Sequence, residues 1–317
     1  MRISTNQIYS NGVGGLQNLT GSLYSLQNQI STGRRIVTPQ DDPVGSAQAL
    51  LVSQAKSVNE LYVKNQETAD TKLRSLDNVL SGVNDELQSV YEKAVAAGNG
   101  TYSDSERAGI AVELKQRLTS ILALANSQDG AGRYIFAGFE STTPPFTQNA
   151  TSVSPYSLTQ TYVDYNGDDG VQRLQISASE DMATNEPGSS VFMRIADAKG
   201  VPTGRSMFDS IQNLVDLLNT PGPVGTNPAY SQSLADIQSS METVNRSRAS
   251  VGARMSSLET LGTVTQGRGV EYDAQLSSLR DLDYAKAISE VTQKKIQLEA
   301  AQATFSQTAK LSLFQYI

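Results

Sequence analysis

Residues 69–97 read ADTKLRSLDNVLSGVNDELQSVYEKAVAA, and this stretch decides the fold. Its apolar positions recur at alternating steps of four and three residues without a miss; they are Ala69, Leu73, Leu76, Leu80, Val83, Leu87, Val90, Ala94 and Ala97. Such a stripe occupies one face of an α-helix that packs against another helix. Asp42 is a suitable N-cap, Pro43 is a suitable first residue, and Gly98 and Gly100 end the pattern. The sequence therefore predicts one long helix over residues 43–97.

Further helices are predicted on both sides of the long one. Ser103 and Glu106 form a capping box, and the stripe that follows predicts a third helix, antiparallel to the second. Shorter stripes predict a helix that ends at Gly33, one over residues 207–218, one over residues 234–258 and one from residue 284 to the C-terminus. The first and last of these stripes are interrupted by glycines or polar residues. We therefore expect the two terminal helices to pair with each other.

The middle of the chain has a different pattern. Residues 141–204 are rich in Thr, Ser, Gly, Pro and Tyr, and residues 161–165 and 171–176 flank the turn sequence NGDDG, which predicts a β-hairpin. We expect an α+β protein in which the N- and C-terminal regions form a long antiparallel, coiled-coil-like helical bundle around a small all-β insert. The predicted domains are terminal helices 1–42 and 276–317, disordered before assembly; a helical core 43–140 and 206–275 with a short β element; and the insert 141–205.

The composition excludes several classes of protein. The chain has 317 residues, with 25 basic and 32 acidic side chains and a formal charge of −7, which argues against nucleic acid as its main partner. It has no cysteine, histidine or tryptophan, which removes thiolate chemistry, the commonest general base and the commonest metal ligand. Its apolar runs are far shorter than the roughly 18 residues of a membrane span. We therefore expect no cofactor and no membrane partner. The first residues lack an apolar segment, so if the protein leaves the cell, it does so by a route that needs no cleaved signal.

Two pairs of residues invite a catalytic interpretation, and each pair also has a simpler one. Asp41 and Asp42 bring two carboxylates together, but the following Pro43 favours a helix cap. Ser53 and Lys56 match a serine–lysine nucleophile pattern without its companion motifs, so a solvated helix face is favoured. The sequence therefore predicts no catalytic residue.

A third set resembles part of a calcium loop. Asp164, Asn166 and Asp168 occupy alternate positions, but Gly170 comes one residue late and Gln175 stands where a bidentate glutamate belongs. A plain hairpin turn is favoured. Whether the three side chains bind an ion stays open at this point, and no metal site is predicted.

Several motifs, in order, resemble those of one superfamily. ISTGRRI at 30–36 with DDPVG at 41–45, NGTYSDSER at 99–107 and NRSRASVGARM at 245–255 are similar to the terminal signatures of bacterial flagellins. The start MRISTNQIY, the run GRYIFAG at 132–138 and the ending SLFQYI resemble one branch of it, the hook–filament junction proteins. The similarity covers roughly residues 1–140 and 206–317.

This resemblance implies a structural protein of the bacterial flagellum and not an enzyme. Members of that branch are exported unfolded by the flagellar type III apparatus, with the help of an export chaperone, and are extracellular. They assemble as a ring that joins hook-associated protein 1 to the flagellin filament. The implied partners are therefore hook-associated protein 1, flagellin, the chaperone and further copies of the chain, with no nucleic acid and no membrane.

The apolar residues of the terminal helices are the expected assembly interface, because such interrupted helices are marginal alone. They are Leu16, Leu19, Leu23, Leu26, Ile30, Ile288, Val291, Leu298, Phe305, Leu313 and Phe314. Two alternatives remain: the chain is flagellin, the filament subunit, or it is a surface-exposed binding module. In the second case Tyr156, Tyr162 and Tyr165 of the insert would contact a carbohydrate or a host surface, although they suit a β core equally well.

Overall fold

The structure is a computed structural model that describes residues 5–149, 161–195 and 203–311. The α-helices along the described chain are α1 (Thr5–Thr32), α2 (Pro43–Ala97), α3 (Asp104–Ala125), α4 (Met207–Leu218), α5 (Pro228–Arg280) and α6 (Tyr284–Leu311). Between α3 and α4 lie the strands β1 (Phe146–Gln148), β2 (Val163–Tyr165), β3 (Arg173–Gln175) and β4 (Asp181–Ala183), and the π-helix η1 (Ser189–Met193). The chain forms two compact units: one is Leu61–Thr265, and the other is Met1–Glu60 together with Gln266–Ile317.

The core of the Leu61–Thr265 unit is built on the stripe predicted for α2. All nine of its residues are fully buried, together with the predicted stripe of α3, which is Ala111, Leu114, Leu118, Ile121 and Ala125. From α5 the core receives Ile237, Val244, Val251 and Leu258. The hydroxyl of Tyr230 on α5 donates a hydrogen bond to the Ala94 carbonyl on α2, over 2.8 Å. The prediction of a long helical bundle with a small insert is therefore confirmed.

Three predicted helix ends are confirmed, whereas the helix predicted over residues 234–258 is longer and forms α5 (Pro228–Arg280). The Gly45 N–H donates to Asp42 Oδ1 over 2.8 Å, so Asp42 caps α2. Gly33, directly after α1, has a φ of 68°, a left-handed conformation that favours glycine. Ser103 and Glu106 form the capping box of α3.

The insert differs from the prediction in its strand pairing. β2 pairs with β1, from Phe146 opposite Tyr165, and β3 pairs with β4, from Arg173 opposite Ala183, both antiparallel. The predicted hairpin between residues 161–165 and 171–176 is therefore wrong. The described part of the insert is also not all-β, because it contains η1.

Asp168 supplies the physical reason for the missing hairpin. One oxygen of its carboxylate accepts the N–H groups of Phe139 over 2.7 Å and Gly170 over 2.8 Å. The Tyr165 hydroxyl donates to the Asp168 carbonyl over 2.8 Å. These bonds hold the NGDDG segment against the loop around residue 139 instead of closing it as a tight turn. The two flanking strands consequently find other partners.

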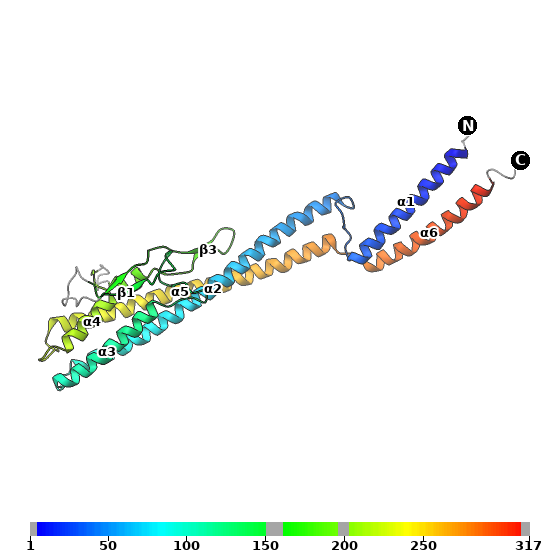
Figure 1. Ribbon diagram of the computed structural model, residues 1–317. Coiled ribbons are helices and arrows are strands. Elements are labelled where there is room, and N and C mark those ends of the chain that lie inside the picture. The colour runs from blue at the N-terminus through cyan, green and yellow to red at the C-terminus, as the bar shows by residue number, and fades with distance from the viewer. Residues whose placement is uncertain (1–4, 150–160, 196–202, 312–317) are drawn as a thin grey trace. The chain divides into compact units, whose positions relative to one another are not determined.

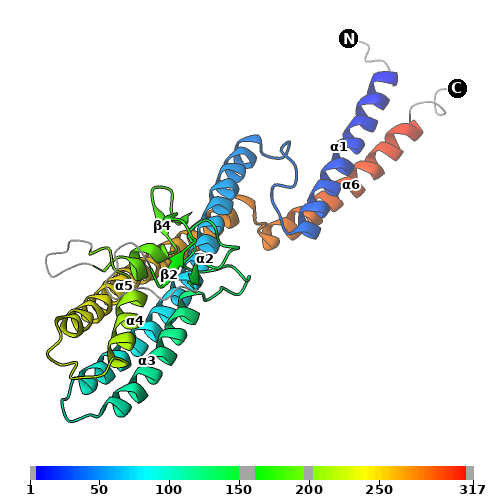
Figure 2. The same ribbon diagram turned by 60° about the vertical axis from the view of Figure 1, so that its left-hand side comes forward.

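In the other unit, α1 and α6 form an antiparallel pair. Both views show the two helices side by side, with the start of α1 and the end of α6 at one end of the pair (Figures 1 and 2). The same unit contains the beginning of α2, the end of α5 and the loop of residues 33–42. This unit carries the residues that the sequence assigns to assembly.

Candidate assembly interface

The α1–α6 pair buries its apolar seam only in part. On α1 the seam consists of Leu16, Leu19, Leu23, Leu26 and Ile30, all of which are half-buried. On α6, Val291, Leu298 and Phe305 are half-buried and Ala287 is buried. The rings of Tyr9 and Phe305 lie 5.1 Å apart. By contrast, stripe residues of α2 in the Leu61–Thr265 unit are fully buried. The pair therefore retains apolar surface that a neighbouring molecule can cover.

Small residues leave a groove in this seam. A side-chain carbon at Gly12 would lie 2.7 Å from the ring of Phe305, so only glycine admits the ring in this position. Around these two residues is a groove of about 360 Å³, lined by Asn11, Gly12, Gly15, Leu16, Leu19, Ala301, Thr304 and Phe305. Its lining is mostly apolar or small, which suits apolar side chains of another subunit.

The structure corrects the expected phase of α6. Ile288 was predicted on the same face as Val291 and Leu298, but 56% of its surface is exposed. Ala287 and Lys294 lie closer to the seam, at the three- and four-residue spacing that includes Val291 and Leu298. Ile288 consequently faces outward from the pair. Leu313 and Phe314 lie outside the described residues.

Two connecting segments, residues 33–35 and 279–282, are hydrogen-bonded to each other where α1 ends and α6 begins. The Leu282 N–H donates to the Gly33 carbonyl over 3.0 Å, and the Arg35 N–H donates to the Arg280 carbonyl over 2.7 Å. The Arg35 guanidinium also donates to the Leu279 carbonyl over 2.8 Å and pairs with Asp42 over 3.1 Å. We call this the junction clasp (residues 33–35, 42 and 279–282). It links the α1–α2 connection to the α5–α6 connection, and it explains the packing of the ISTGRRI and DDP motifs.

Several apolar residues of α2 and α5 in the same unit are also exposed, and the sequence did not predict their exposure. Val44, Leu50, Leu51 and Val58 on α2 and Val270 on α5 are exposed, with Leu50 at 65% and Leu51 at 66%. The sequence does contain a signal: two adjacent leucines stand in a polar helix, outside the heptad stripe.

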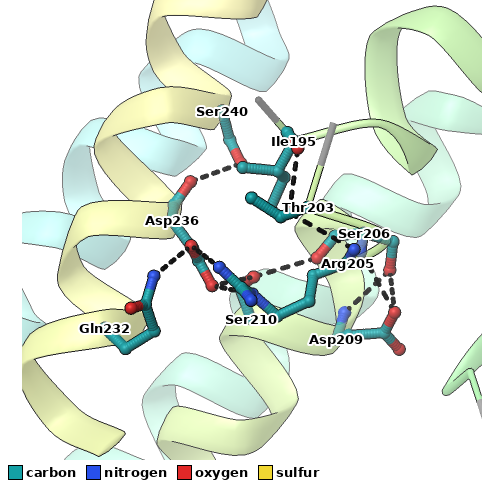
Figure 3. A network of polar contacts seen from close by, with 9 residues as sticks. All are labelled: Ile195, Thr203, Arg205, Ser206, Asp209, Ser210, Gln232, Asp236 and Ser240. Atoms are coloured by element: carbon teal, nitrogen blue, oxygen red, sulfur yellow. Dashed lines mark hydrogen bonds and ion pairs between the residues drawn. The ribbon is translucent and has the colours of Figure 1, made fainter. Parts of the chain in front are cut away.

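In the Leu61–Thr265 unit a polar network joins the start of α4 to α5 and supports the scaffold. Figure 3 shows the Arg205 guanidinium facing both carboxylate oxygens of Asp236, at 2.6 and 2.8 Å. Gln232 and Ser210 also donate to this carboxylate, over 2.9 and 3.4 Å. Ser206 and Asp209 form the capping box of α4 beside it. Because the Asp236 side chain is only 4% exposed, this network is a structural ion pair and not a solvated site.

The residues with a catalytic interpretation are engaged in structure. The Thr38 and Gly45 backbone N–H groups hold the pKa of Asp41 and Asp42, respectively, below their ordinary value. Lys56 pairs with Asp273 of α5, which raises the pKa of the Lys56 ammonium. Each shift stabilises the charged form, whereas a proton donor or an activated amine needs the opposite.

The calcium-like residues are also engaged within the insert. Asp164 accepts a hydrogen bond from Thr161 over 2.8 Å, Asn166 donates to Thr147 over 2.8 Å, and Asp168 holds the loop described above. Within residues 5–149, 161–195 and 203–311, no group of three or more acidic side chains is placed to hold a metal ion. No helix in these ranges is long and apolar enough to cross a membrane. Tyr162 and Tyr165 pack partly buried against the core, and Tyr156 lies outside the described residues.

Comparison with known proteins gives consistent matches along the whole chain. Residues 3–141 match the bacterial flagellin N-terminal helical region, and residues 234–317 match the bacterial flagellin C-terminal helical region. The chain is 32% identical to flagellar hook-associated protein 3 of Salmonella typhimurium, over 99% of both chains. It is 31% identical to flagellar hook-associated protein 3 of Escherichia coli, again over 99% of both.

A solved structure has the same fold. The crystal structure of the flagellar junction protein from Legionella pneumophila matches with a TM-score of 0.61 and 21% identity, covering 74% of this chain and 100% of that one. The sequence identity above 30% over the full length and the matches to both flagellin helical regions lead to one assignment. The chain belongs to the flagellar hook-associated protein 3 family within the flagellins, which are structural proteins of the flagellum and not enzymes.

Proposed function

We propose that the chain is the structural adaptor at the hook–filament junction. It assembles as a ring of identical subunits, contacts hook-associated protein 1 on one side and flagellin on the other, and reaches its site through the flagellar type III apparatus with an export chaperone. The likeness over 99% of a hook-associated protein 3 supports this proposal. The main observation that supports it is the exposed apolar surface of the α1–α6 pair.

The physical reason for assembly is that the α1–α6 pair by itself leaves the outer faces of both helices in water. Two helices alone cannot bury more than one face of each, so the opposite faces meet water unless other helices arrive. Exposed apolar residues of the two helices outside the seam include Tyr24, Ile288 and Ile296. Neighbouring subunits would remove them from water and so favour assembly by the hydrophobic effect. The assembly interface in this proposal comprises the half-buried seam residues named above together with Ile288, Leu313 and Phe314.

The proposal is tested by locating the protein on isolated flagella with a specific antibody. We expect a narrow band at the distal end of the hook. Cells that lack the protein should have hooks without filaments, and flagellin should accumulate in the medium. Staining along the whole filament would instead identify a filament subunit, and staining away from the flagellum would favour a surface binding module.

A further inference from the structure

A small cavity in the Leu61–Thr265 unit contains an ammonium group without a charged partner. The cavity measures about 40 Å³ and is lined by Lys72, Ser75, Asp129, Arg133, Tyr134, Ile135, Ser141, Gln172, Thr184 and Asn185. Lys72 Nζ donates to the Gln172 side-chain carbonyl over 3.0 Å. Within the described part of the chain, no carboxylate lies within ion-pair distance of Lys72. Two of its three N–H donors therefore lack a protein acceptor there.

The acid that lines the cavity is already used by its own turn. Asp129 Oδ1 accepts the N–H groups of Ala131 and Arg133 over 2.9 and 3.0 Å, and Asp129 Oδ2 pairs with the Arg133 guanidinium over 3.1 Å. Burial disfavours the Asp129 carboxylate, but these donors hold its pKa below the ordinary value. Asp129 consequently serves Arg133 and its turn, and the cavity as a whole keeps an excess positive charge.

The acceptor of Lys72 is held rigidly. The Gln172 side-chain amide donates to the Gly138 carbonyl over 2.9 Å, and its backbone N–H donates to Asn185 Oδ1 over 2.7 Å. The Thr184 N–H donates to the Gln172 carbonyl over 2.9 Å. The neutral amide therefore orients the ammonium but cannot neutralise it. Burial lowers the pKa of Lys72, repulsion from Arg133 lowers it further, and attraction to Asp129 offsets only part of this. A cation in such a place gains from a second anion.

We propose that the cavity between Lys72 and Arg133 is a binding site for a single carboxylate group. A carboxylate accepts charge-assisted hydrogen bonds from an ammonium and a guanidinium together, and hydroxyl groups of Ser75 and Ser141 line the same cavity. The volume admits a carboxylate or a few water molecules, but it is far below the roughly 300 Å³ of a typical metabolite pocket. The carboxylate is either a small free acid or an Asp or Glu side chain of a neighbouring subunit.

The first experiment uses acetate as the probe on the purified full-length chain. Thermal unfolding is followed in 100 mM sodium acetate and in sodium chloride of equal ionic strength. We expect acetate to raise the midpoint by roughly 2 °C or more relative to chloride, and we expect Lys72→Gln to abolish that difference. Lys64→Gln is the matched control, because Lys64 is exposed on the same helix and does not line the cavity. It should keep the wild-type difference.

The second experiment separates the two sources of the carboxylate. A carbodiimide joins an amine to a carboxylate in direct contact, and mass spectrometry of treated, isolated flagella then identifies the joined peptides. An amide between Lys72 and an Asp or Glu of another subunit assigns the site to a neighbour, whereas acetate stabilisation without this cross-link assigns it to a free acid. The absence of both effects overturns the proposal and leaves a water-filled cavity. If Lys72→Gln does not fold, Arg133→Gln, at an exposed residue, serves as the second variant.

Discussion

At the scale of single residues, substitutions in the Arg205–Asp236 pair test how much a buried ion pair stabilises the Leu61–Thr265 unit. The side chain of Arg205 is 19% exposed and that of Asp236 is 4% exposed. Removing one partner therefore leaves the charge of the other unpaired and poorly solvated. We expect Arg205→Met to lower the free energy of unfolding by about 3 kcal/mol. The double change to Arg205→Met with Asp236→Leu should recover more than half of the loss, because no unpaired charge remains. Urea unfolding monitored by circular dichroism measures both.

Arg248→Met is the matched control for this prediction. Arg248 pairs with Asp77 over 3.0 Å, but the two side chains are about one third exposed, and water screens the charges. Its loss should lower the free energy of unfolding by at most about 1 kcal/mol. Equal losses in Arg205→Met and Arg248→Met would show that the burial of the Arg205–Asp236 pair has no energetic consequence.

The junction clasp should respond to acid through Asp42. The Gly45 N–H and then Arg35 hold the pKa of Asp42 below its ordinary value of 3.8. A group whose pKa is lower in the folded state stabilises that state above its unfolded pKa, and this contribution is lost as the pH falls through the folded value. The clasp should therefore be intact at pH 5 and weaken below pH 3.8.

The amide resonance of Gly45 reports this titration by NMR. We expect its midpoint to lie below 3.8 in the wild type and to rise in Arg35→Gln, which removes the ion pair. Arg34→Gln makes the same change in charge within the clasp and should shift the midpoint much less, because Arg34 is exposed and Asp42 pairs with Arg35 instead. A midpoint that rises equally in both variants would mean that the general field, and not the Arg35 contact, sets this pKa.

At the scale of the element, α6 shows what sequence periodicity can and cannot predict. The stripes of α2 and α3 were predicted residue by residue, because Leu, Ile and Val alternate there with charged residues and leave one possible phase. In α6 the apolar residues are sparse, and alanines complete the seam. Alanine contributes little to a hydrophobic stripe, so Ala287 and Ala301 gave no signal and Ile288 was assigned to the wrong face. The polar network at Asp236 was missed for a related reason, since burial of an acid depends on partners distant in sequence.

The observed phase of α6 predicts different effects for a charge placed in the α1–α6 seam and for a charge placed on the outer face of α6. Leu298→Asp places a charge in the half-buried α1–α6 seam, whereas Ile288→Asp places it on an exposed face. We expect Leu298→Asp to reduce the helicity of the isolated subunit and to prevent filament growth. Ile288→Asp should keep the helicity of the isolated subunit yet impair filament growth, because other subunits cover this face in the proposed assembly. Circular dichroism and a swimming assay distinguish the two.

The outcome for Ile288→Asp decides whether the outer face matters. Gln297→Asp is a suitable control, because Gln297 is exposed on the same helix and already polar. It should swim like the wild type. Normal swimming of Ile288→Asp would remove Ile288 from the assembly interface while leaving the seam residues in place.

At the scale of the whole molecule, the sequence predicted the helical bundle correctly but did not predict the strand pairing of the insert. Long periodic helices repeat the same local signal many times, so errors at single positions do not matter. The strands of the insert are three residues each, and their pairing depends on side chains such as Asp168 and Tyr165 that bond to distant loops. Turn propensity alone predicted a hairpin that these contacts prevent.

The difference in burial between the two units predicts where the isolated subunit opens first. In the Leu61–Thr265 unit the stripes of α2 and α3 are buried, whereas the α1–α6 seam is half-buried and contains a groove of about 360 Å³. Local opening requires the least free energy where few apolar contacts are lost. We expect thermolysin to cut α1 and α6 of the isolated subunit within minutes and to leave a resistant fragment of about residues 40–280.

The same digestion on isolated flagella is the control that connects this opening to assembly. In the proposed assembly, neighbouring subunits cover the exposed faces of α1 and α6 and bind only the ordered pair, and binding to one state stabilises that state by mass action. Both helices should therefore resist cleavage in the flagellum under conditions that trim the isolated subunit, as mass spectrometry of the fragments would show. Survival of the full-length isolated subunit for as long as its 40–280 fragment would mean that the pair is stable by itself. Assembly would then have no folding step to drive, and the exposed faces of α1 and α6 would be interfaces between preformed helices.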